Sequence, residues 1–445
     1  MNKTVREQIV DLLIEIEKEA SYAQLVLKRA LQDIDAKDKG FVTEVVYGTL
    51  KYQIKLDYIL NQFSKTPVHR MKPLIRNVMR MSLYQMLYLD KVPTSAIINE
   101  AVKIVKKRKF QNLSGFVNGL LRNIDRQREQ IIYPDETKNL VLAMSIHYAI
   151  PEWMIEEWLK VYKEEEVKSI CEALNERAEV CARYNTLKTN KLEFEETLKV
   201  EGIQLKEGAF LEEAFYLKGV DNLQNSPSFK KGEWTVQDES AMLVAHVMAP
   251  QKGDCILDMC SAPGGKSIHM AELMENAGRI VSCDIHPHKL ELIKKNAERM
   301  GITIIEPTLQ DGTLKNECYV EAFDKVLLDA PCSGLGIMKR KPDIRTHKSK
   351  EGLLEIVALQ KKLALAAISY LKPGGRLVYS TCTISHEENE GMVSYIKALG
   401  LELENIVDTI PSPLKRAIKE KGMIQILPHM AGTDGFFIAS FKKGV

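Results

Sequence analysis

The sequence lacks the features that would mark a membrane or secreted protein. Its longest apolar stretches, such as Leu363–Leu371, are about half the roughly 20 residues that a membrane span needs. The first residues carry charged side chains in a helical pattern and have no apolar core of a secretory signal. We therefore expect no contact with a membrane, and a location in the cytoplasm.

The sequence also lacks the cysteine spacing of a metal or redox motif. Its 8 cysteines form no C-x-x-C pair and no Cys/His cluster at zinc spacing. His286 and His288 have no third ligand nearby in the sequence. We expect that the protein holds no metal, that its thiols stay reduced, and that most of them are small core residues.

Net charge is almost absent, but the total hides two opposed parts. The 445 residues sum to +2, whereas residues 1–135 carry +8 and the remainder −6. The excess is densest in residues 65–130, with a net charge of +10. Such a surface suits a polyanion such as nucleic acid, because phosphate neutralisation releases counterions. A solvated helical face is the alternative.

The length predicts several domains. Residues 1–133 show apolar residues at helical spacing, as in Ile97, Ala101 and Ile104, which predicts an all-α domain. Residues 134–235 mix acidic helical patterns with short alternating segments, which indicates a small α+β middle domain. Residues 236–445 alternate buried strand patterns with helical ones, which is typical of a doubly wound α/β domain.

The α/β domain has five predicted parallel strands and a different ending. Two further strand-like runs, Met423–Leu427 and Gly435–Phe441, are separated by a short loop with no helix. That spacing predicts an antiparallel hairpin at the sheet edge. The parallel strands are predicted at Cys255–Met259, Arg279–Asp284, Thr303–Glu306, Lys325–Asp329 and Arg376–Ser380.

A cofactor loop is predicted after the first of these strands, at Cys260–Lys266. Its small residues let a ligand approach the backbone, and the following helix offers free amides. It has neither G-x-G-x-x-G nor a phosphate-binding G-K-[ST] motif. The strand ends in Asp258, which suits the cationic amino acid end of S-adenosylmethionine better than a phosphate. A generic nucleotide fold is the alternative. Asp284 is placed to bind ribose hydroxyls, and Asp311 to accept from an adenine amino group.

Two cysteines, Cys332 and Cys382, follow the ends of the fourth and fifth strands, where open α/β sheets bind ligands. A thiolate that adds to carbon 6 of cytosine makes carbon 5 nucleophilic toward a methyl sulfonium. A carboxyl such as Asp329 can hydrogen-bond ring nitrogen 3. The spacing does not decide which cysteine is the nucleophile. The basic residues after Cys332 are expected to contact RNA phosphates: Lys339, Arg340, Lys341, Arg345, Lys348 and Lys350.

These motifs resemble a known family. Gln237–Ser240, Asp258–Lys266, Asp329–Ser333 and Ser380–Cys382 resemble the RNA cytosine-C5 methyltransferases of the RsmB/Sun (Nop2/NSUN) type. The segments Pro93–Lys103 and Phe116–Asn123 resemble the helical NusB-type RNA-binding domain. The pairing is similar to the bacterial enzymes that methylate small-subunit (16S) ribosomal RNA.

The resemblance implies roles for single residues. Cys382 would be the nucleophile, Cys332 would assist product release, and Asp329 would be the third catalytic residue. Ser261 and Thr383 depart from the usual Ala and Ser, and both are small. The cofactor pocket would comprise Cys260, Ser261, Ala262, Pro263, Gly264, Gly265, Lys266, Asp284, Asp311 and Asp329.

The resemblance also implies the partners. We expect a monomer that uses S-adenosylmethionine and binds ribosomal RNA, with no DNA, membrane or metal. The alternatives are the same chemistry on transfer RNA, or an inactive NusB-like RNA-binding or assembly factor.

Overall fold

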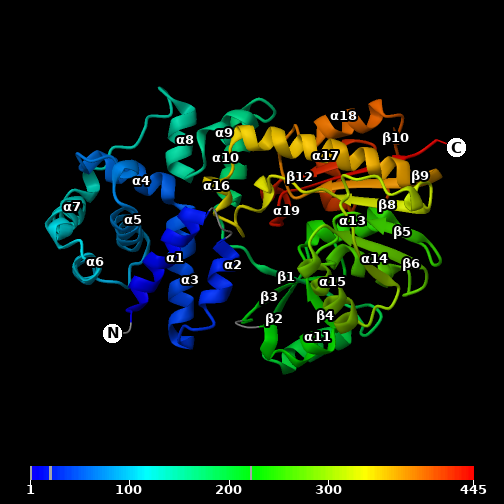
Figure 1. The fold of residues 1–445 in the computed structure, drawn as a ribbon, viewed down its shortest axis with the longest axis horizontal. Coiled ribbons are helices and arrows are strands. Elements are labelled where there is room, and N and C mark those ends of the chain that lie inside the picture. Colours follow the sequence, from blue (N-terminus) through cyan, green and yellow to red (C-terminus); the bar gives the residue numbers. More distant parts are fainter. Residues whose placement is uncertain (1–2, 20–22, 221–222, 445) are drawn as a thin grey trace. The chain divides into compact units, whose positions relative to one another are not determined.

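The computed structural model describes residues 3–19, 23–220 and 223–444 (Figure 1). The chain divides into two compact units. The first comprises residues 1–175 together with the distant segment Arg340–Ser349, and the second comprises the rest. None of the helices in the described ranges is long and apolar enough to cross a membrane. The predicted domain limits near residues 133 and 235 stay predictions.

The first unit is built from helices around one apolar core. The helix α5, Pro73–Tyr88, lies at its centre and buries residues on almost every turn. The methionines Met71, Met79, Met81 and Met86 belong to this core. The other helices of residues 3–126 are α1 (Val5–Glu19), α2 (Ala23–Ala30), α3 (Ala36–Lys51), α4 (Gln53–Phe63), α6 (Thr94–Lys107) and α7 (Ser114–Arg126).

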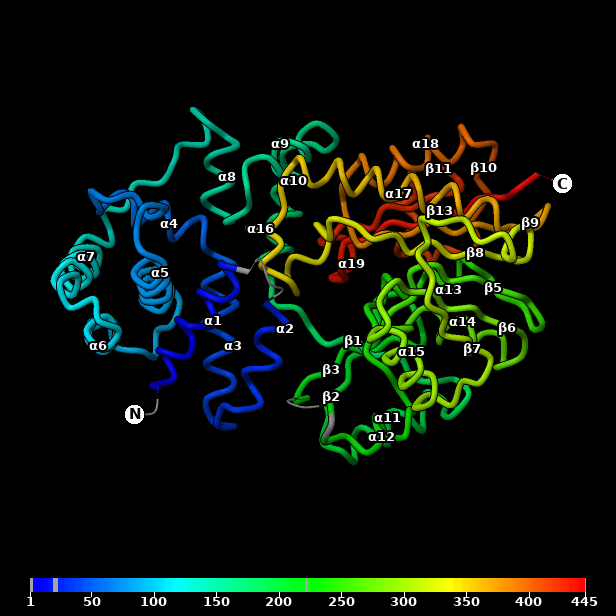
Figure 2. The backbone as a smooth tube through the Cα atoms, viewed as in Figure 1, coloured from blue at the N-terminus to red at the C-terminus, as the bar shows by residue number. Residues whose placement is uncertain are grey.

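Three more helices and an inserted segment complete this unit. They are α8 (Leu140–Tyr148), α9 (Glu152–Leu159), α10 (Glu164–Ala173) and the short α16 (Ile344–His347). In Figure 2 the yellow tube of α16 runs beside the green α10. The insertion follows the Cys332 loop in sequence, so the chain leaves the second unit after Lys339 and re-enters it at Lys350.

Arg345 of α16 is buried, which corrects the expectation that it contacts phosphates. Its guanidinium donates to five oxygens at the carboxyl ends of α3, α8 and α10, where helix carbonyls have no partner within the helix. These ends also carry partial negative charge, so one cation satisfies them together. The acceptors are the carbonyls of Lys51, Tyr148, Ala149 and Leu174 and Oδ1 of Asn175, at 3.0–3.2 Å.

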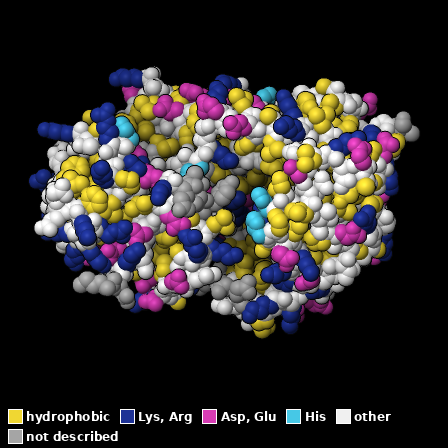
Figure 3. Space-filling view, in the orientation of Figure 1, with side chains coloured by type: hydrophobic (Ala, Val, Ile, Leu, Met, Phe, Trp, Pro, Cys, Tyr) yellow, Lys and Arg dark blue, Asp and Glu magenta, His cyan; other side chains and the backbone are white. Residues whose placement is uncertain are grey.

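Most basic side chains of residues 65–130 are exposed on the helical unit, and Figure 3 shows Lys and Arg in several places on its face. The three that are not exposed are held in ion pairs: Arg76 with Glu17, Arg80 with Asp57 and Arg108 with Asp11. Three of the exposed ones also have a carboxylate partner, namely Lys103, Lys107 and Arg128. The exposed ones are Lys65, Arg70, Lys72, Lys91, Lys103, Lys106, Lys107, Lys109, Arg122, Arg126 and Arg128.

The second unit begins with a small antiparallel sheet. Its strand order is β2-β3-β1-β4. The aromatic side chains of Phe194, Phe215 and Trp234 are buried in one hydrophobic cluster. The elements are β1 (Val180–Tyr184), α11 (Lys191–Val200), β2 (Gln204–Glu207), β3 (Ala214–Lys218), α12 (Pro227–Lys231) and β4 (Trp234–Val236).

The large sheet has the order β11-β12-β13-β9-β8-β5-β6-β7, with β10 beside β13. All pairings among β5 to β9 are parallel, and those of β13 are antiparallel. The strands are β5 (Cys255–Asp258), β6 (Arg279–Asp284), β7 (Ile305–Leu309), β8 (Phe323–Asp329), β9 (Leu371–Thr381), β10 (Glu402–Leu403), β11 (Ile418–Glu420), β12 (Met423–Ile426) and β13 (Phe436–Lys442).

Helices cover both faces of this sheet (Figure 1). One face carries α13 (Glu239–Met248), α14 (Gly265–Leu273) and α15 (Pro287–Met300), and the other carries α17 (Lys350–Tyr370) and α18 (Glu390–Ala398). The combination of an all-α part, a small mixed sheet and a doubly wound sheet confirms the predicted fold class. The edge hairpin β12–β13 is also confirmed, but its connection contains a short helix, α19 (Pro428–Ala431), where no helix was expected.

Candidate active site

The predicted site residues gather at one edge of the large sheet. Parallel strands align their carboxyl ends, so the loops that follow β5, β6, β7, β8 and β9 open on the same side. Asp284 ends β6 and Asp329 ends β8, while Cys382 directly follows β9. The segment Cys260–Lys266 follows β5 and includes the first two residues of α14, which begins at Gly265.

Serine hydroxyls fix the start of the cofactor loop. Ser267 Oγ donates to Asp258 Oδ2 at 2.6 Å and lies 2.9 Å from Ser261 Oγ. Ser282 Oγ on β6 donates to Ser267 Oγ at 2.8 Å. Gly264 has a φ of 99°, a conformation that glycine adopts without steric cost. The loop therefore has a defined shape before any ligand arrives.

Asp258 has an unused acceptor. Its side chain is buried, and Oδ1 has no hydrogen-bond partner among the described residues. Burial raises the pKa of Asp258 to about 6, against the opposing bond from Ser267. An ammonium group close to Oδ1 would satisfy this atom and favour the ionised carboxylate. The residues therefore fit the amino acid end of S-adenosylmethionine.

Asp284 and Asp311 follow the next two strands. Asp284 Oδ1 accepts from the backbone N–H of His286 at 2.9 Å, and Oδ2 lies 3.5 Å from Lys289 Nζ. Asp311 Oδ1 accepts from the amide and hydroxyl of Thr313, and these bonds lower the pKa of Asp311. Asp311 thus stays an ionised acceptor at neutral pH, as binding of an amino group requires.

The two thiols are adjacent. Cys332 Sγ lies 3.3 Å from Cys382 Sγ, and both side chains are half-buried. The hydrogen bond to Cys382, burial and the charge of Glu388 together raise the pKa of Cys332 well above its ordinary value. Cys332 is therefore protonated at neutral pH, and its S–H can donate to the sulfur of Cys382.

Lys266 points toward Asp329. Its Nζ donates to Asp329 Oδ2 at 2.7 Å, and Ser380 Oγ donates to Oδ1 at 2.7 Å. Burial acts to lower the pKa of Lys266, but the charge and hydrogen bond of Asp329 outweigh it and raise the pKa. The same ammonium interacts electrostatically with Cys382. Lys266 therefore links the cofactor loop to the two-thiol site, a role that its position in a glycine-rich loop did not reveal.

Sequence reasoning missed the residues that hold the thiol loops. Glu388 is fully buried and accepts from Ser333, the residue that follows Cys332. Gln360 of α17 donates both to Glu388 and to the carbonyl of Pro331. Glu388 stands in the run Glu387–Glu390, which has the composition of a solvated surface. Only its distance of six residues from Cys382 could have singled it out.

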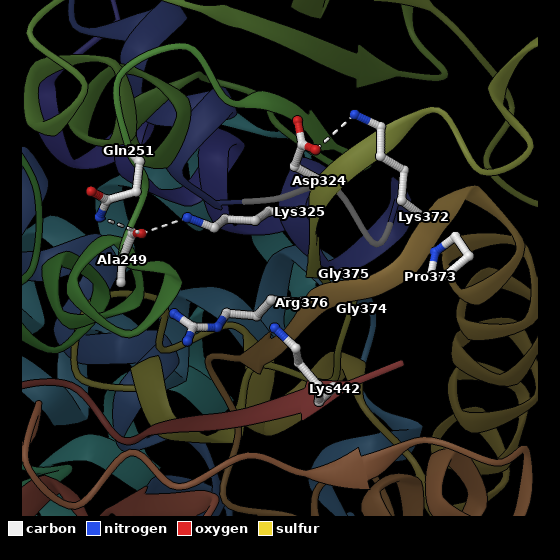
Figure 4. Close-up of a pocket in the computed structure, with 10 residues that line it drawn as sticks. All are labelled: Ala249, Gln251, Asp324, Lys325, Lys372, Pro373, Gly374, Gly375, Arg376 and Lys442. Atoms are coloured by element: carbon white, nitrogen blue, oxygen red, sulfur yellow. Dashed lines mark hydrogen bonds and ion pairs between the residues drawn. The ribbon is translucent and has the colours of Figure 1, made fainter. Parts of the chain in front are cut away.

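A cavity of about 410 Å³ lies at the opposite edge of the sheet (Figure 4). It is lined by the starts of β8 and β9 and the end of β13. Three of its cations have carboxylate partners: Lys325 contacts Asp254, Lys372 contacts Asp324 and Arg376 contacts Glu404. The cavity is thus separate from the two-thiol site.

One group of metal-ligating side chains occurs in the described part of the chain: Glu213, His246 and His269. Glu213 Oε1 lies 2.6 Å from His246 Nε2 and 3.5 Å from His269 Nε2. Hydrogen bonds from the two rings account for this arrangement. The other ring nitrogen of His269 has no partner, although a metal ligand usually fixes it. The absence of a metal stays a prediction.

The fold and the site define the class of protein. A doubly wound sheet with a Gly-Gly loop after its first strand, acidic residues after the next strands and an orphaned carboxylate oxygen is the arrangement of an S-adenosylmethionine-dependent methyltransferase. The family model described as "16S rRNA methyltransferase RsmB/F" matches residues 245–442. The model of the NusB family matches residues 3–126, and an RsmF/B-like ferredoxin-like domain matches residues 150–223.

Relatives match along the whole chain. The "probable ribosomal RNA small subunit methyltransferase B" of Bacillus subtilis is 38% identical over 100% of both chains. The ribosomal RNA small subunit methyltransferase B of Pectobacterium carotovorum is 31% identical, with coverage of 93% of this chain and 92% of that one. This protein belongs to the RsmB/F family of 16S rRNA methyltransferases, which confirms the resemblance seen in the sequence.

Solved structures agree. The crystal structure of PH0851 superposes with a TM-score of 0.83 and 26% identity over 100% of both chains. NSun6 from Pyrococcus horikoshii, solved with the S-adenosylmethionine analogue SFG, gives a TM-score of 0.60 and 26% identity. It covers 66% of this chain and 99% of that one. The cofactor of this protein is S-adenosylmethionine, as predicted.

Proposed function

We propose that the protein methylates carbon 5 of a cytosine in small-subunit (16S) ribosomal RNA through a covalent cysteine–cytosine bond. The observation that carries this proposal is the pair of thiols 3.3 Å apart, beside the Lys266–Asp329 ion pair. Transfer to oxygen or to an exocyclic nitrogen needs no thiol, whereas carbon 5 of cytosine is a poor nucleophile until a thiolate adds to carbon 6.

Cys382 is the proposed nucleophile. Its thiolate attacks carbon 6, and carbon 5 becomes the nucleophilic end of an enamine. Lys266, which interacts with Cys382, stabilises the thiolate before attack. Asp329, held by Lys266 and Ser380, is placed to hydrogen-bond the ring at nitrogen 3. S-adenosylmethionine, bound by Cys260–Lys266, Asp284, Asp311 and Asp329, supplies the methyl group.

Cys332 is proposed to assist release. After the carbon 5 proton has left to a base, the bond between carbon 6 and the Cys382 sulfur breaks and that sulfur departs as a thiolate. The protonated Cys332 donates a hydrogen bond to the departing sulfur, which stabilises its negative charge. The two cysteines thus have different proposed tasks.

The other parts of the chain would bind the RNA. We assign RNA binding to the helical domain, 1–133, because exposed basic residues are concentrated between residues 65 and 130. The middle domain, 134–235, would bind RNA or link the other two domains. A ribosomal RNA substrate places the enzyme in the cytoplasm. Action as a monomer, without DNA, membrane or metal, stays a prediction.

The test is methyl transfer from labelled S-adenosylmethionine to ribosomal and transfer RNA, with bisulfite sequencing of the product. We expect a single 5-methylcytosine in 16S RNA, and no transfer by Cys382→Ala. Cys318→Ala removes an exposed thiol and serves as the matched control. Retained turnover in Cys382→Ala would exclude Cys382 as nucleophile. Methylation confined to transfer RNA would mean that the substrate is transfer RNA and not 16S ribosomal RNA.

A further inference from the structure

Hydrogen bonds hold both sequence neighbours of Cys332 in place. On its carboxyl side, the N–H of Ser333 donates to Glu388 Oε2 at 2.8 Å, and the Ser333 hydroxyl donates to Glu388 Oε1. On its amino side, the carbonyl of Pro331 accepts from Gln360 Nε2 at 2.9 Å. The same Gln360 nitrogen donates to Glu388 Oε2 at 3.0 Å. One carboxylate therefore connects both neighbours of Cys332.

The same carboxylate belongs to the Cys382 loop. Glu388 follows Cys382 by six residues, and its carbonyl accepts from Tyr379 of β9 at 2.7 Å. Thr383, directly after Cys382, lies 2.7 Å from the Ser333 hydroxyl through its own Oγ1. The backbone N–H of Gly336 donates to the carbonyl of Cys382 at 3.1 Å. Hydrogen bonds between Ser333 of the Cys332 loop and Thr383 and Glu388 of the Cys382 loop thus join the two loops.

Burying this carboxylate has a cost that a purely apolar filler would avoid. Glu388 is 0% exposed, and removing an ionised carboxylate from water costs several kcal/mol unless donors surround it. Its two oxygens accept from three donors on two residues. An amide at this position would offer one acceptor oxygen for the Ser333 N–H and the Gln360 N–H2, and its own N–H2 could only donate. A carboxylate therefore satisfies these donors better than an amide.

We propose that Glu388 is a positioning residue for the two-thiol site, which acts through Ser333 and Gln360 to keep the Cys332 sulfur against the Cys382 sulfur. The inference rests on the proposed function, because it assigns Glu388 to the release of the covalent adduct. Glu388 touches neither substrate nor cofactor in this role. Its negative charge also favours the protonated form of Cys332, the form that donates to the departing sulfur.

The test compares Glu388→Gln with Glu387→Gln, the same change one residue earlier. Glu387 accepts from Ser385 and has no hydrogen bond to the Cys332 loop among the bonds described here. We expect Glu388→Gln to lower kcat roughly tenfold or more, to leave the KM for S-adenosylmethionine within about twofold of wild type, and to accumulate a protein–RNA adduct on denaturing gels. Glu387→Gln should behave as wild type.

A second variant covers the case in which Glu388→Gln does not fold. Ser333→Ala removes only the hydroxyl bonds to Glu388 and Thr383 and keeps the backbone bond, so a smaller accumulation of adduct is expected. Wild-type turnover without adduct in folded Glu388→Gln, or in Ser333→Ala if only that variant folds, overturns the inference. Wild type and Cys332→Ala are run alongside. If neither methylates nor traps RNA, the proposed function itself has failed.

Discussion

The sulfur of Cys332 lies 3.3 Å from the sulfur of Cys382, although the residues are separated by 50 positions in the sequence. The pairing of β8 with β9 produces this proximity, because Asp329 is in register with Ser380 and each cysteine follows shortly after. A negative charge at one sulfur disfavours a charge on the other. The geometry therefore favours a protonated Cys332, whose S–H can donate to the Cys382 sulfur.

The first prediction concerns product release. In Cys332→Ala the Cys382 sulfur can still attack carbon 6, but it loses the S–H that stabilises it as it departs. The covalent protein–RNA adduct should therefore accumulate as a slowly migrating band on a denaturing gel. Cys382→Ala, which cannot form the bond, should show no band. A Cys332→Ala protein that turns over without an adduct would give Cys332 another role.

The second prediction concerns Lys266. Lys266→Met keeps much of the side-chain volume but removes the cation that contacts Asp329 and acts on Cys382. Because the charge stabilises a thiolate and orients a carboxylate, we expect methyl transfer to fall by about a hundredfold. Binding of S-adenosylmethionine, measured by calorimetry, should weaken by less than the rate falls, because Lys266 is one of several proposed cofactor contacts. A loss of cofactor affinity that equals the loss in rate would mean that Lys266 acts only through the cofactor and not on Asp329 or Cys382.

The sequence predicted the parts of the site that depend on strand order. Cys332 and Cys382 follow buried β patterns, and the carboxyl ends of parallel strands share one edge, so their proximity needed no further information. The cofactor loop was found in the same way. Arg279–Asp284 was predicted with the bounds of β6 itself, whereas β9 begins five residues before its predicted start, at Leu371.

Contacts between segments that are distant in the sequence could not be predicted from local sequence patterns. The segment that contains Arg345 has the composition of a basic surface loop, and its partners come from residues 51 to 175, at three helix ends that no local pattern joins to it. Glu388 was overlooked for the same reason: its partners Ser333 and Gln360 lie 55 and 28 positions away. Periodicity indicates which face of an element is buried, but not which distant polar group meets it.

The third prediction concerns Asp258 and pH. Burial raises its pKa to about 6 in the folded protein, above the ordinary value of the unfolded chain. Between about pH 4 and pH 6 the folded state binds more protons, so the free energy of unfolding falls as the pH rises, by about 3 kcal/mol in total. Asp258→Asn removes this cost, so its stability relative to wild type should rise across that window and then level off.

Urea unfolding without cofactor, at pH values from about 4.5 to 7, measures this difference. Asp311→Asn is the control whose stability relative to wild type should stay nearly constant over this range, because Thr313 lowers the pKa of Asp311 and its titration therefore lies at lower pH. A relative stability of Asp258→Asn that stays constant over the window would show that the folded protein does not raise the pKa of Asp258.

The fourth prediction concerns Arg345. Burial lowers its pKa only to about 10, so the guanidinium stays charged at neutral pH among its five acceptors. Arg345→Ala leaves those carbonyls unpaired and should lower the free energy of unfolding of the helical unit by about 3–5 kcal/mol. Arg345→Lys should recover only part of the lost free energy of unfolding, because an ammonium cannot reach the ends of three helices at once.

Thermal unfolding and hydrogen exchange over α3, α8 and α10 report this loss. Lys348→Ala, which removes a cation from the same inserted segment, is the matched control and should unfold like wild type. Equal exchange rates in Arg345→Ala and wild type would mean that water replaces the guanidinium at these helix ends.

The fifth prediction concerns the basic face of the helical unit. Deletion of residues 1–130 would remove α4, which packs against α8, and the Lys51 carbonyl that Arg345 of α16 contacts, so substitutions are the cleaner test. Lys106, Lys109 and Arg126 are exposed on and beside α6 and α7. If each contacts an RNA phosphate, changing all three to Ala should reduce the slope of log K against log salt by about 2.

Lys415, Lys419 and Lys421, exposed on the second unit, provide a control triple with the same loss of charge. An unchanged slope in the first triple would mean that this face is solvated and that RNA binds elsewhere on the chain.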